Sequence, residues 1–379
     1  MKPLVFLLLL LSFAAASFAQ STYKNLPVIK ASAALADYRV ADLWTRGQWS
    51  YAPEAVPDVL LVPTFSRTVS FGFYTDKDSI VFPMNSRTVK QFYVLTPEGK
   101  YALTEVRGFD YNRVAYDAKT KPATYPFWYE TGAQNEYLNR LKAQYLLEKV
   151  VEGATSDSAK ALRLLKWTHD QWKHNGENEP TRRDALSILE EVKATGKQFR
   201  CVEYGIVGAA ALNAIGLPAR VLGLKMKDVE TIEGGAGHVL LEVYLPDMKK
   251  WVLMDGQWDA MPVLNGVPLN AVEFQQAIAT RYEALQIRSR SGTDKANYVK
   301  WIFPYLYYMD VAFDNREGAG LEKKPYKGKR SLMLVPQGAK EPKVFQKSNP
   351  INYAIYTRSL ADFYAAPHPL PLKGSASAQ

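Results

Sequence analysis

The sequence predicts an α+β fold with a β-rich N-terminal region, a mixed core and a C-terminal extension. Residues 56–116 consist of short strand-like runs separated by turn residues, whereas a helical period begins at Glu136. A helix headed by Cys201 is then followed by two apolar runs with the spacing of a β-hairpin. Together these features indicate one β-rich region and one region that combines both kinds of element.

Residues 1–19 have the features of a secretory signal peptide. Lys2 precedes a short leucine-rich run, and the small-residue site Ser17-Phe18-Ala19 follows it. The apolar run is too short to span a membrane, and no cysteine follows it that could carry a lipid anchor. We therefore expect cleavage after Ala19 and export to the periplasm or the outside of the cell.

Residues 20–125 are expected to form a β-rich region, as an antiparallel sheet or a small sandwich. A short helix is expected within it at residues 32–44. The strand-like runs are separated by turn residues and lie at residues 66–74, 79–82, 90–95 and 100–106. Residues 119–125 resemble a linker to the next domain.

The core, residues 126–265, is expected to begin with three helices. From Glu136 the apolar residues recur with the helical period. A second helix is expected at residues 157–172 and a third at residues 184–192, followed by a loop that leads to Cys201.

Cys201, the only cysteine of the chain, heads a further helix that is rich in glycine and alanine. Small residues allow close packing, so we expect this helix to be central and buried. It ends where Gly216 supplies a cap and Pro218 prevents continuation. The free N–H groups and the dipole at a helix N-terminus favour a thiolate. With one cysteine there is no internal disulfide, so the thiol is either a buried small group or a nucleophile.

Two further candidates lie on the predicted hairpin. His238 opens the first apolar run, and Asp255 closes the second. If Leu245 pairs with Met248 across a two-residue turn, the same register places His238 directly opposite Asp255, with Cβ atoms roughly 5 Å apart. A carboxylate at that distance can orient an imidazole. A slip of one residue would put the two side chains on opposite faces.

The C-terminal extension, residues 266–366, is expected to contain a helix at residues 269–287. An aromatic and extended run should follow at residues 298–313, and then two strands at residues 331–335 and 351–356. These strands could extend the sheet of the core or return to the N-terminal sheet. The tail, residues 367–379, is expected to be disordered.

The core resembles the transglutaminase-like superfamily of papain-like cysteine enzymes. The resemblance covers about residues 135–261 and rests on the order of its motifs. These are the cysteine at a helix start, the helix ending on Gly-Leu-Pro-Ala-Arg, Gly-His at a strand start, and Trp-Val-Leu-Met-Asp. It implies an antiparallel sheet packed on a central helix, and a catalytic triad of Cys201, His238 and Asp255. Gly-Gln after Asp255 and Lys-Gln-Phe-Arg before Cys201 depart from the family pattern, so substrate and oxyanion details stay open.

The expected activity is that of an exported thiol enzyme. It would transfer or hydrolyse the acyl group of an amide or peptide bond through a cysteine thioester, without a metal or other cofactor. The substrate would be a protein, a peptide or a peptidoglycan-like amide. The alternative is an inactive transglutaminase-like scaffold that binds a glycan or envelope polymer, or serves as an assembly module.

Composition limits the partners. The chain carries 47 Lys and Arg residues against 38 Asp and Glu residues, a net charge of +9 spread along its length, which allows weak attraction to anionic envelope polymers. It has no nucleic-acid-binding motif, and no stable membrane insertion is expected. The 23 Tyr, 16 Phe and 8 Trp residues should mostly fill core and strands, and an aromatic groove for a glycan is a secondary expectation.

Several other residues have secondary assignments. An oxyanion hole needs N–H donors, for which the backbone of Cys201 is the first candidate and Gln198 a second. Three aromatic residues, Trp251, Trp258 and Tyr204, are candidate walls of a substrate cleft.

The remaining titratable residues near these motifs are expected to have structural roles. Glu203 should serve the helix start, and Asp259 is more simply a turn residue than an alternative carboxylate. His169 and His174 should be surface or packing residues. One cysteine and scattered histidines make a zinc site improbable.

Overall fold

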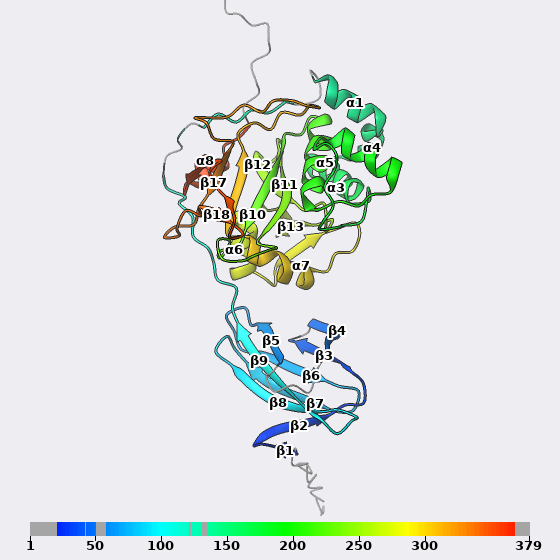
Figure 1. Ribbon diagram of the computed structural model, residues 1–379, viewed down its shortest axis with the longest axis vertical. Helices are drawn as coiled ribbons and strands as arrows, with labels where there is room; N and C mark the ends of the chain where they lie inside the picture. The colour runs from blue at the N-terminus through cyan, green and yellow to red at the C-terminus, as the bar shows by residue number, and fades with distance from the viewer. Residues whose placement is uncertain are drawn as a thin grey trace, which may run out of the picture. The chain divides into compact units, whose positions relative to one another are not determined.

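The computed structural model describes residues 21–41, 43–50, 58–120, 123, 125–130 and 135–367. The expected signal peptide, residues 121, 122 and 124 of the expected linker, and the tail beyond residue 367 lie outside the described residues. The chain divides into two compact units, one ending at Asp110 and one beginning at Tyr111 (Figure 1). Among the described residues, no helix is long and apolar enough to cross a membrane.

The first unit is a β-sandwich. Its two sheets have the strand orders β1-β2-β8-β9-β5 and β4-β3-β6-β7. The strands are β1 (Thr22–Tyr23), β2 (Leu26–Lys30), β3 (Leu35–Val40), β4 (Leu43–Ser50), β5 (Asp58–Pro63), β6 (Val69–Tyr74), β7 (Ser79–Met84), β8 (Val89–Leu95) and β9 (Tyr101–Phe109). One buried apolar core joins the two sheets, with Phe92 and Val94 from one and Phe71 and Phe73 from the other. The β-rich region is confirmed, although β2–β8 and β5–β9 pair in parallel.

The helix predicted at residues 32–44 is wrong. Strands β3 and β4 occupy this segment, and the alternate residues Ala36, Tyr38 and Val40 of β3 are buried. The alanines of this stretch have a high helix propensity. The alternate burial of these residues in the core between the two sheets, where Tyr38 also lies beside Phe71 of the neighbouring strand β6, outweighs that propensity.

The second unit is built on a six-stranded sheet with the order β12-β11-β10-β16-β17-β20. Its strands are β10 (Ala219–Lys225), β11 (Gly237–Leu245), β12 (Lys250–Met254), β16 (Tyr308–Ala312), β17 (Ser331–Leu334) and β20 (Ala354–Thr357). All neighbours are antiparallel except β17 and β20. The C-terminal strands therefore extend the sheet of the core, which decides between the two placements that the sequence left open.

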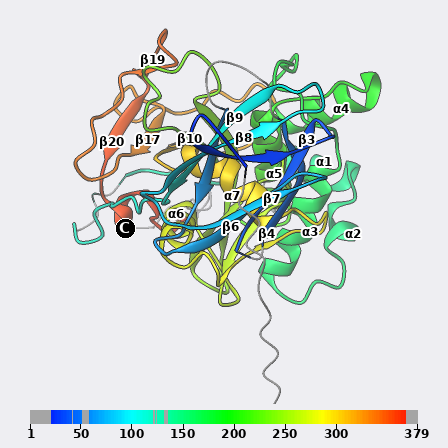
Figure 2. The same cartoon turned by 90° about the horizontal axis from the view of Figure 1, so that it is seen from below.

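In the described part of the chain, five α-helices precede the sheet. They are α1 (Glu136–Gln144), α2 (Leu147–Val151), α3 (Asp157–His169), α4 (Ala185–Thr195) and α5 (Cys201–Ala214). In both views α1, α3 and α4 lie on one side of the unit, and β17 lies on the opposite side (Figure 1, Figure 2).

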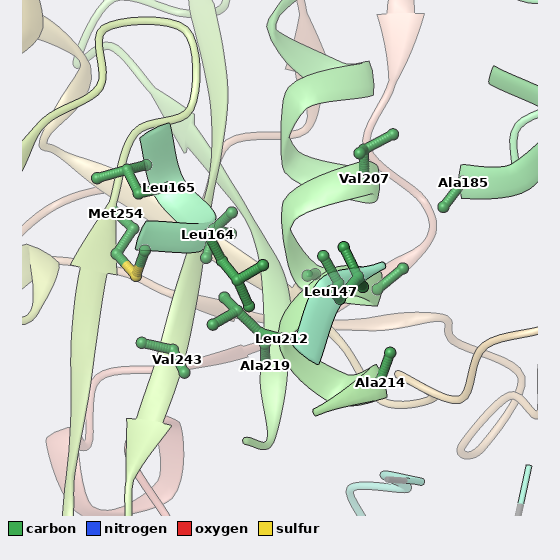
Figure 3. Close-up of a cluster of buried hydrophobic side chains, with 14 of the residues drawn as sticks. Leu147, Leu164, Leu165, Ala185, Val207, Leu212, Ala214, Ala219, Val243 and Met254 are labelled. Carbon is green, nitrogen blue, oxygen red and sulfur yellow. The ribbon is translucent and has the colours of Figure 1, made fainter. Parts of the chain in front are cut away.

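Helix α5 packs across one face of the sheet. Its Leu212 lies beside Ala219 of β10 and Val243 of β11 in the buried core (Figure 3). A Cβ atom added to Gly205 would come within 3.0 Å of the backbone oxygen of Leu240, so a glycine here lets the helix approach β11 closely. The predicted central, buried helix is confirmed.

The remaining elements follow the hairpin. A small sheet contains β13 (Met261–Leu264), β14 (Val267–Pro268) and β15 (Leu285–Arg288), and a two-stranded ribbon contains β18 (Val344–Phe345) and β19 (Asn349–Pro350). Three helices, α6 (Ala271–Thr280), α7 (Lys295–Ile302) and α8 (Leu360–Phe363), contact side chains on the sheet face that α5 does not cover. The helix predicted at residues 269–287 is therefore shorter than expected, since β15 takes over its end.

The extended run predicted at residues 298–313 is wrong in its first half. Residues 298–302 belong to α7, a 3₁₀ turn η2 (Phe303–Tyr305) follows, and only β16 is extended. Asp294 caps α7 by accepting a hydrogen bond from the backbone N–H of Asn297. Burial of Tyr298, Val299 and Ile302 follows the helical period, which a reading based on aromatic content overlooks.

Candidate active site

Cys201 is the first residue of α5, with Arg200 at the N-cap. Glu203, in the first turn, accepts a hydrogen bond from the backbone N–H of Arg200 at 3.1 Å and pairs with its guanidinium at 3.0 Å. Glu203 therefore serves the helix start, as expected. Cys201 is only partly buried, although it stands at the N-terminus of a buried helix.

The hairpin that carries His238 and Asp255 has a different register from the predicted one. Its turn is four residues long, 246–249, with Lys249 at φ +50°, so Leu245 pairs with Lys250. The prediction that His238 lies directly opposite Asp255 is therefore wrong, because the register of the hairpin differs by two residues. A shift of two preserves the face on which each side chain lies, so His238 and Asp255 become diagonal neighbours on one face.

His238 lies near both of its predicted partners. Its Nε2 lies 2.9 Å from Oδ2 of Asp255, and Cys201 is near enough to the ring to raise the pKa of His238. Because Nε2 faces the carboxylate, Nδ1 is the nitrogen that remains for the sulfur. His238 is 2% exposed and Asp255 is fully buried. The structure thus brings together three residues that are far apart in the sequence.

Asp255 is held from both of its carboxylate oxygens. Oδ1 accepts the backbone N–H groups of Gln257 at 3.0 Å and Trp258 at 3.3 Å. Oδ2 receives His238 and also the hydroxyl of Tyr298, at 3.1 Å. Four donors leave the carboxylate little freedom to turn.

The electrostatics of His238 favour its charged form. Burial lowers the pKa of His238, but the charge of Asp255 and hydrogen bonds with Asp255 and Cys201 outweigh burial and raise this pKa to about 9. An imidazolium near neutral pH is the counter-charge that a Cys201 thiolate needs. The arrangement can therefore hold a thiolate–imidazolium pair.

An aromatic group that the sequence analysis missed surrounds His238. Trp301 meets the imidazole edge-on, with ring centroids 4.7 Å apart, and the centroid of Tyr305 lies 6.0 Å from that of His238. Trp258, a predicted cleft residue, joins this group through Trp301 at 5.1 Å. Tyr298, Trp301 and Tyr305 are spaced three and four residues apart, a helical signal that could have been found in the sequence.

His174 is a second residue that sequence reasoning left outside the site. It is exposed, on the loop after α3, and this loop is tied to the approach to Cys201 because Asn175 N–H donates to Phe199 O and Asn178 Nδ2 to Gln198 O, each at 2.9 Å. Burial and the charge of His238 lower the pKa of His174, while Asp255 acts in the opposite direction. The sequence carries no signal for this proximity.

The other sequence-predicted residues lie as follows. Trp251 lies elsewhere, with its Nε1 donating to Ala365 O at 2.9 Å and Arg220 stacked on its ring. Tyr204 is 1% exposed and donates to Trp172 O at 2.7 Å, so it has no surface to offer a cleft. Gln198 is held through its backbone carbonyl, and its oxyanion role stays a prediction.

Two expectations for plainer roles match the structure. Asp259 has a positive φ of 48° and accepts the backbone N–H groups of Arg290 and Ser291, so it shapes a turn and does not reach His238. His169 Nδ1 lies 3.1 Å from the carbonyl of Gly256, which packs α3 against the loop after Asp255. Within the described part of the chain, no group of three or more His, Cys, Asp or Glu side chains could hold a metal ion.

Residues 144–256 match the family model described as the transglutaminase-like superfamily, a segment that includes Cys201, His238 and Asp255. This match confirms the resemblance seen in the sequence. No curated protein matches the chain.

Several solved structures are similar to parts of the chain. One is a "putative cysteine protease from Cytophaga hutchinsonii", with 13% identity, a TM-score of 0.26 and coverage of 54% of this chain and 71% of that one. A structure described as a TGase has 20% identity, a TM-score of 0.24 and coverage of 33% of each chain. Red sea bream transglutaminase has 9% identity, a TM-score of 0.24 and coverage of 62% of this chain and 49% of that one. The chain thus spans about a third of the TGase and half of the sea bream enzyme.

Proposed function

We propose that this chain, a member of the transglutaminase-like superfamily, is a thiol enzyme that transfers or hydrolyses the acyl group of an amide through a thioester on Cys201. One observation supports this most. A partly buried cysteine at a helix N-terminus lies near an imidazole whose Nε2 is 2.9 Å from a buried carboxylate.

The proposed reaction has two halves. The thiol proton passes to His238 Nδ1, and the thiolate attacks the carbonyl carbon of the amide. The C–N bond breaks, His238 protonates the leaving amine, and the acyl group stays on sulfur as a thioester. Water or a second amine, deprotonated by His238, then attacks the thioester. An acid or a new amide is released, and the thiol of Cys201 is restored.

The position of Cys201 supports the oxyanion step. The first N–H groups of an α-helix have no acceptor within the helix. The N–H of Cys201 is one of these, at the positive end of the α5 dipole. It can therefore donate to the oxygen of a tetrahedral intermediate while the sulfur is attached to the same carbon.

The substrate belongs to the proposal as well. We propose a protein, a peptide or a peptidoglycan-like amide outside the cytoplasm, on the basis of the signal-peptide pattern at residues 1–19. Trp301 and Tyr305 lie beside His238, and Trp258 lies beside Trp301. All three are partly exposed, so they could support a side chain or a sugar ring next to the scissile bond.

The first test is the reactivity of the thiol. Iodoacetamide should alkylate native Cys201 rapidly near neutral pH, and the rate should fall in His238→Ala, as measured by intact mass. Labelling that requires unfolding of the protein would instead favour an inactive scaffold.

The second test seeks the thioester. The protein would be incubated with β-casein and a fluorescent primary amine. Acylation of the Cys201 peptide, lost in hydroxylamine and lacking in Cys201→Ser, is the expected mass-spectrometric result. Fluorescence incorporated into casein would identify an amine as the acceptor, and cleavage or deamidation without incorporation would identify water.

A further inference from the structure

We infer that Tyr298 is a positioning residue for the proposed reaction, since its hydroxyl holds Asp255 in the orientation that makes His238 present Nδ1 to Cys201. The inference rests on the proposed function. It extends the site beyond residues 144–256, the segment that matches the family, because Tyr298 belongs to α7 of the C-terminal extension.

Tyr298 contacts the same carboxylate oxygen of Asp255 that lies next to His238. The hydroxyl of Tyr298 lies 3.1 Å from Oδ2 of Asp255, the same oxygen that lies 2.9 Å from Nε2 of His238. The two backbone N–H groups on Oδ1 leave Oδ2 able to swing about the axis they define. Tyr298 supplies the second attachment, so the carboxylate plane is fixed with Oδ2 toward the imidazole.

Tyr298 acts as a donor at every pH at which the protein would work. Burial, and then the neighbouring Asp255 carboxylate, raise the pKa of Tyr298 well above its ordinary value. The phenol therefore keeps its proton and donates it to the carboxylate. With the Tyr298 and His238 protons on Oδ2, Nε2 must be the protonated nitrogen of a neutral His238, and Nδ1 is left as the acceptor of the thiol proton.

The Tyr298 ring is itself held in place. It is fully buried, stacked on Phe274 of α6 with centroids 6.0 Å apart and tilted against Trp258 at 5.6 Å. One helical turn further along α7, Trp301 rests against the ring of His238. One helix of the extension therefore touches both members of the His238–Asp255 pair, which suits a rigid support.

The test compares pH profiles of Cys201 alkylation by iodoacetamide in the full chain. Tyr298→Phe keeps the ring and removes only the hydroxyl. We expect the rate near neutral pH to fall by about tenfold, in keeping with loss of a hydrogen bond to a charged group. The acidic limb of the profile should move to higher pH, because an imidazolium that is less well oriented toward Cys201 stabilises the thiolate less.

Tyr137→Phe is the matched control. Tyr137 of α1 also donates its hydroxyl to a carboxylate, Asp184, at 3.0 Å, but in the helical part of the unit. Its removal should leave the pH profile unchanged. In an Asp255→Asn background, Tyr298→Phe should have no further effect on the rate, because the hydroxyl acts through Asp255.

The outcomes separate the inference from the proposed function. If wild-type Cys201 reacts like a free cysteine at every pH, the proposed function fails and the inference fails with it. If wild-type Cys201 is reactive but Tyr298→Phe has the same profile, or one shifted to lower pH, the inference alone is overturned. An effect of equal size in the Asp255→Asn background would also overturn it.

Discussion

Strand β11 carries two buried charge pairs on the same face of the sheet. In the middle of the strand, Glu242 pairs with Arg220 of β10 at 2.6 Å, and neither side chain has exposed surface. Near the start of the strand, His238 and Asp255 lie 2.9 Å apart and are almost as deeply buried. Both pairs satisfy charges that would otherwise be costly to bury.

The two pairs differ in the groups that surround them. Arg220 donates to Glu242 and to the carbonyl of Phe363, and it stacks on Trp251 with the guanidinium 4.1 Å from the ring centroid. His238 instead has Cys201 beside its ring, a residue that is only partly buried. The first pair is sealed by protein groups and joins α8 to the sheet. The second is open on one side, which is what acid–base chemistry needs.

We call His238–Asp255 the open pair and Arg220–Glu242 the closed pair. The largest expected effect on reactivity comes from breaking the open pair. His238→Gln should reduce the rate of Cys201 alkylation by about 10²–10⁴-fold, the range of a lost general base. The free energy of unfolding should change less than in the closed pair, because Asp255 keeps Tyr298 and two backbone donors. Quenched alkylation assays measure the rate of Cys201 alkylation, and urea denaturation measures the free energy of unfolding. A large loss of stability with little loss of reactivity would contradict the comparison.

Breaking the closed pair should have the reverse outcome. Arg220→Met leaves Glu242 with the backbone N–H of Ala271 as its donor, at 3.2 Å. We expect a loss of about 3–5 kcal/mol in the free energy of unfolding, measured by urea denaturation, with unchanged alkylation of the protein that remains folded. Adding Glu242→Leu should recover part of the loss, since no unpaired charge is then buried. No recovery in the double variant would argue against an electrostatic cause.

The pH dependence of stability should come from the open pair. The pKa of His238 rises from an ordinary value of 6.5 to about 9 in the folded protein. Its contribution is therefore fully present below about pH 6.5 and is lost as the pH rises through about 9, with an upper limit of roughly 3 kcal/mol. Urea unfolding in this window should show the decline, and His238→Gln should remove it. An equal decline in that variant would assign it to other groups.

The smallest expected effect concerns the rim of the site. A protonated His174 should attract an anionic reagent, so His174→Ala should lower the rate of alkylation by iodoacetate relative to iodoacetamide by roughly twofold at acidic pH. The ratio should be unchanged at alkaline pH, where His174 is neutral. A ratio that shifts equally at both pH values would rule out a charge effect.

Much of the site could be predicted because its signals are local. The glycines and alanines of α5, and the cap that ends this helix, mark a buried helix that begins at Cys201. The apolar runs of β11 and β12 mark a hairpin with His238 and Asp255 on strands that pair. The prediction that His238 pairs directly with Asp255 is wrong because the length of the turn decides the register, and the turn has four residues rather than two.

Other parts of the site could not be predicted in the same way. Trp251 and Trp258 are both near Asp255 in the sequence, yet only Trp258 joins the aromatic group at His238. Trp251 lies further along the same sheet face and packs on Arg220. The sequence predicts an extended run at Tyr298, whereas in the structure this residue belongs to α7 and reaches Asp255 from 43 residues away.

The sequence by itself determined which residues could do chemistry, which elements hold them and that His238 and Asp255 share a sheet face, because these follow from residue type and from a period of two or 3.6. Only the tertiary structure decided which side chains meet. Docking α5 at the end of β11 and α7 on the opposite face depends on long-range packing, which no local period encodes. The hydrogen bond from the Tyr298 hydroxyl to Asp255, and the Nδ1 atom of His238 that faces away from Asp255, both result from that packing.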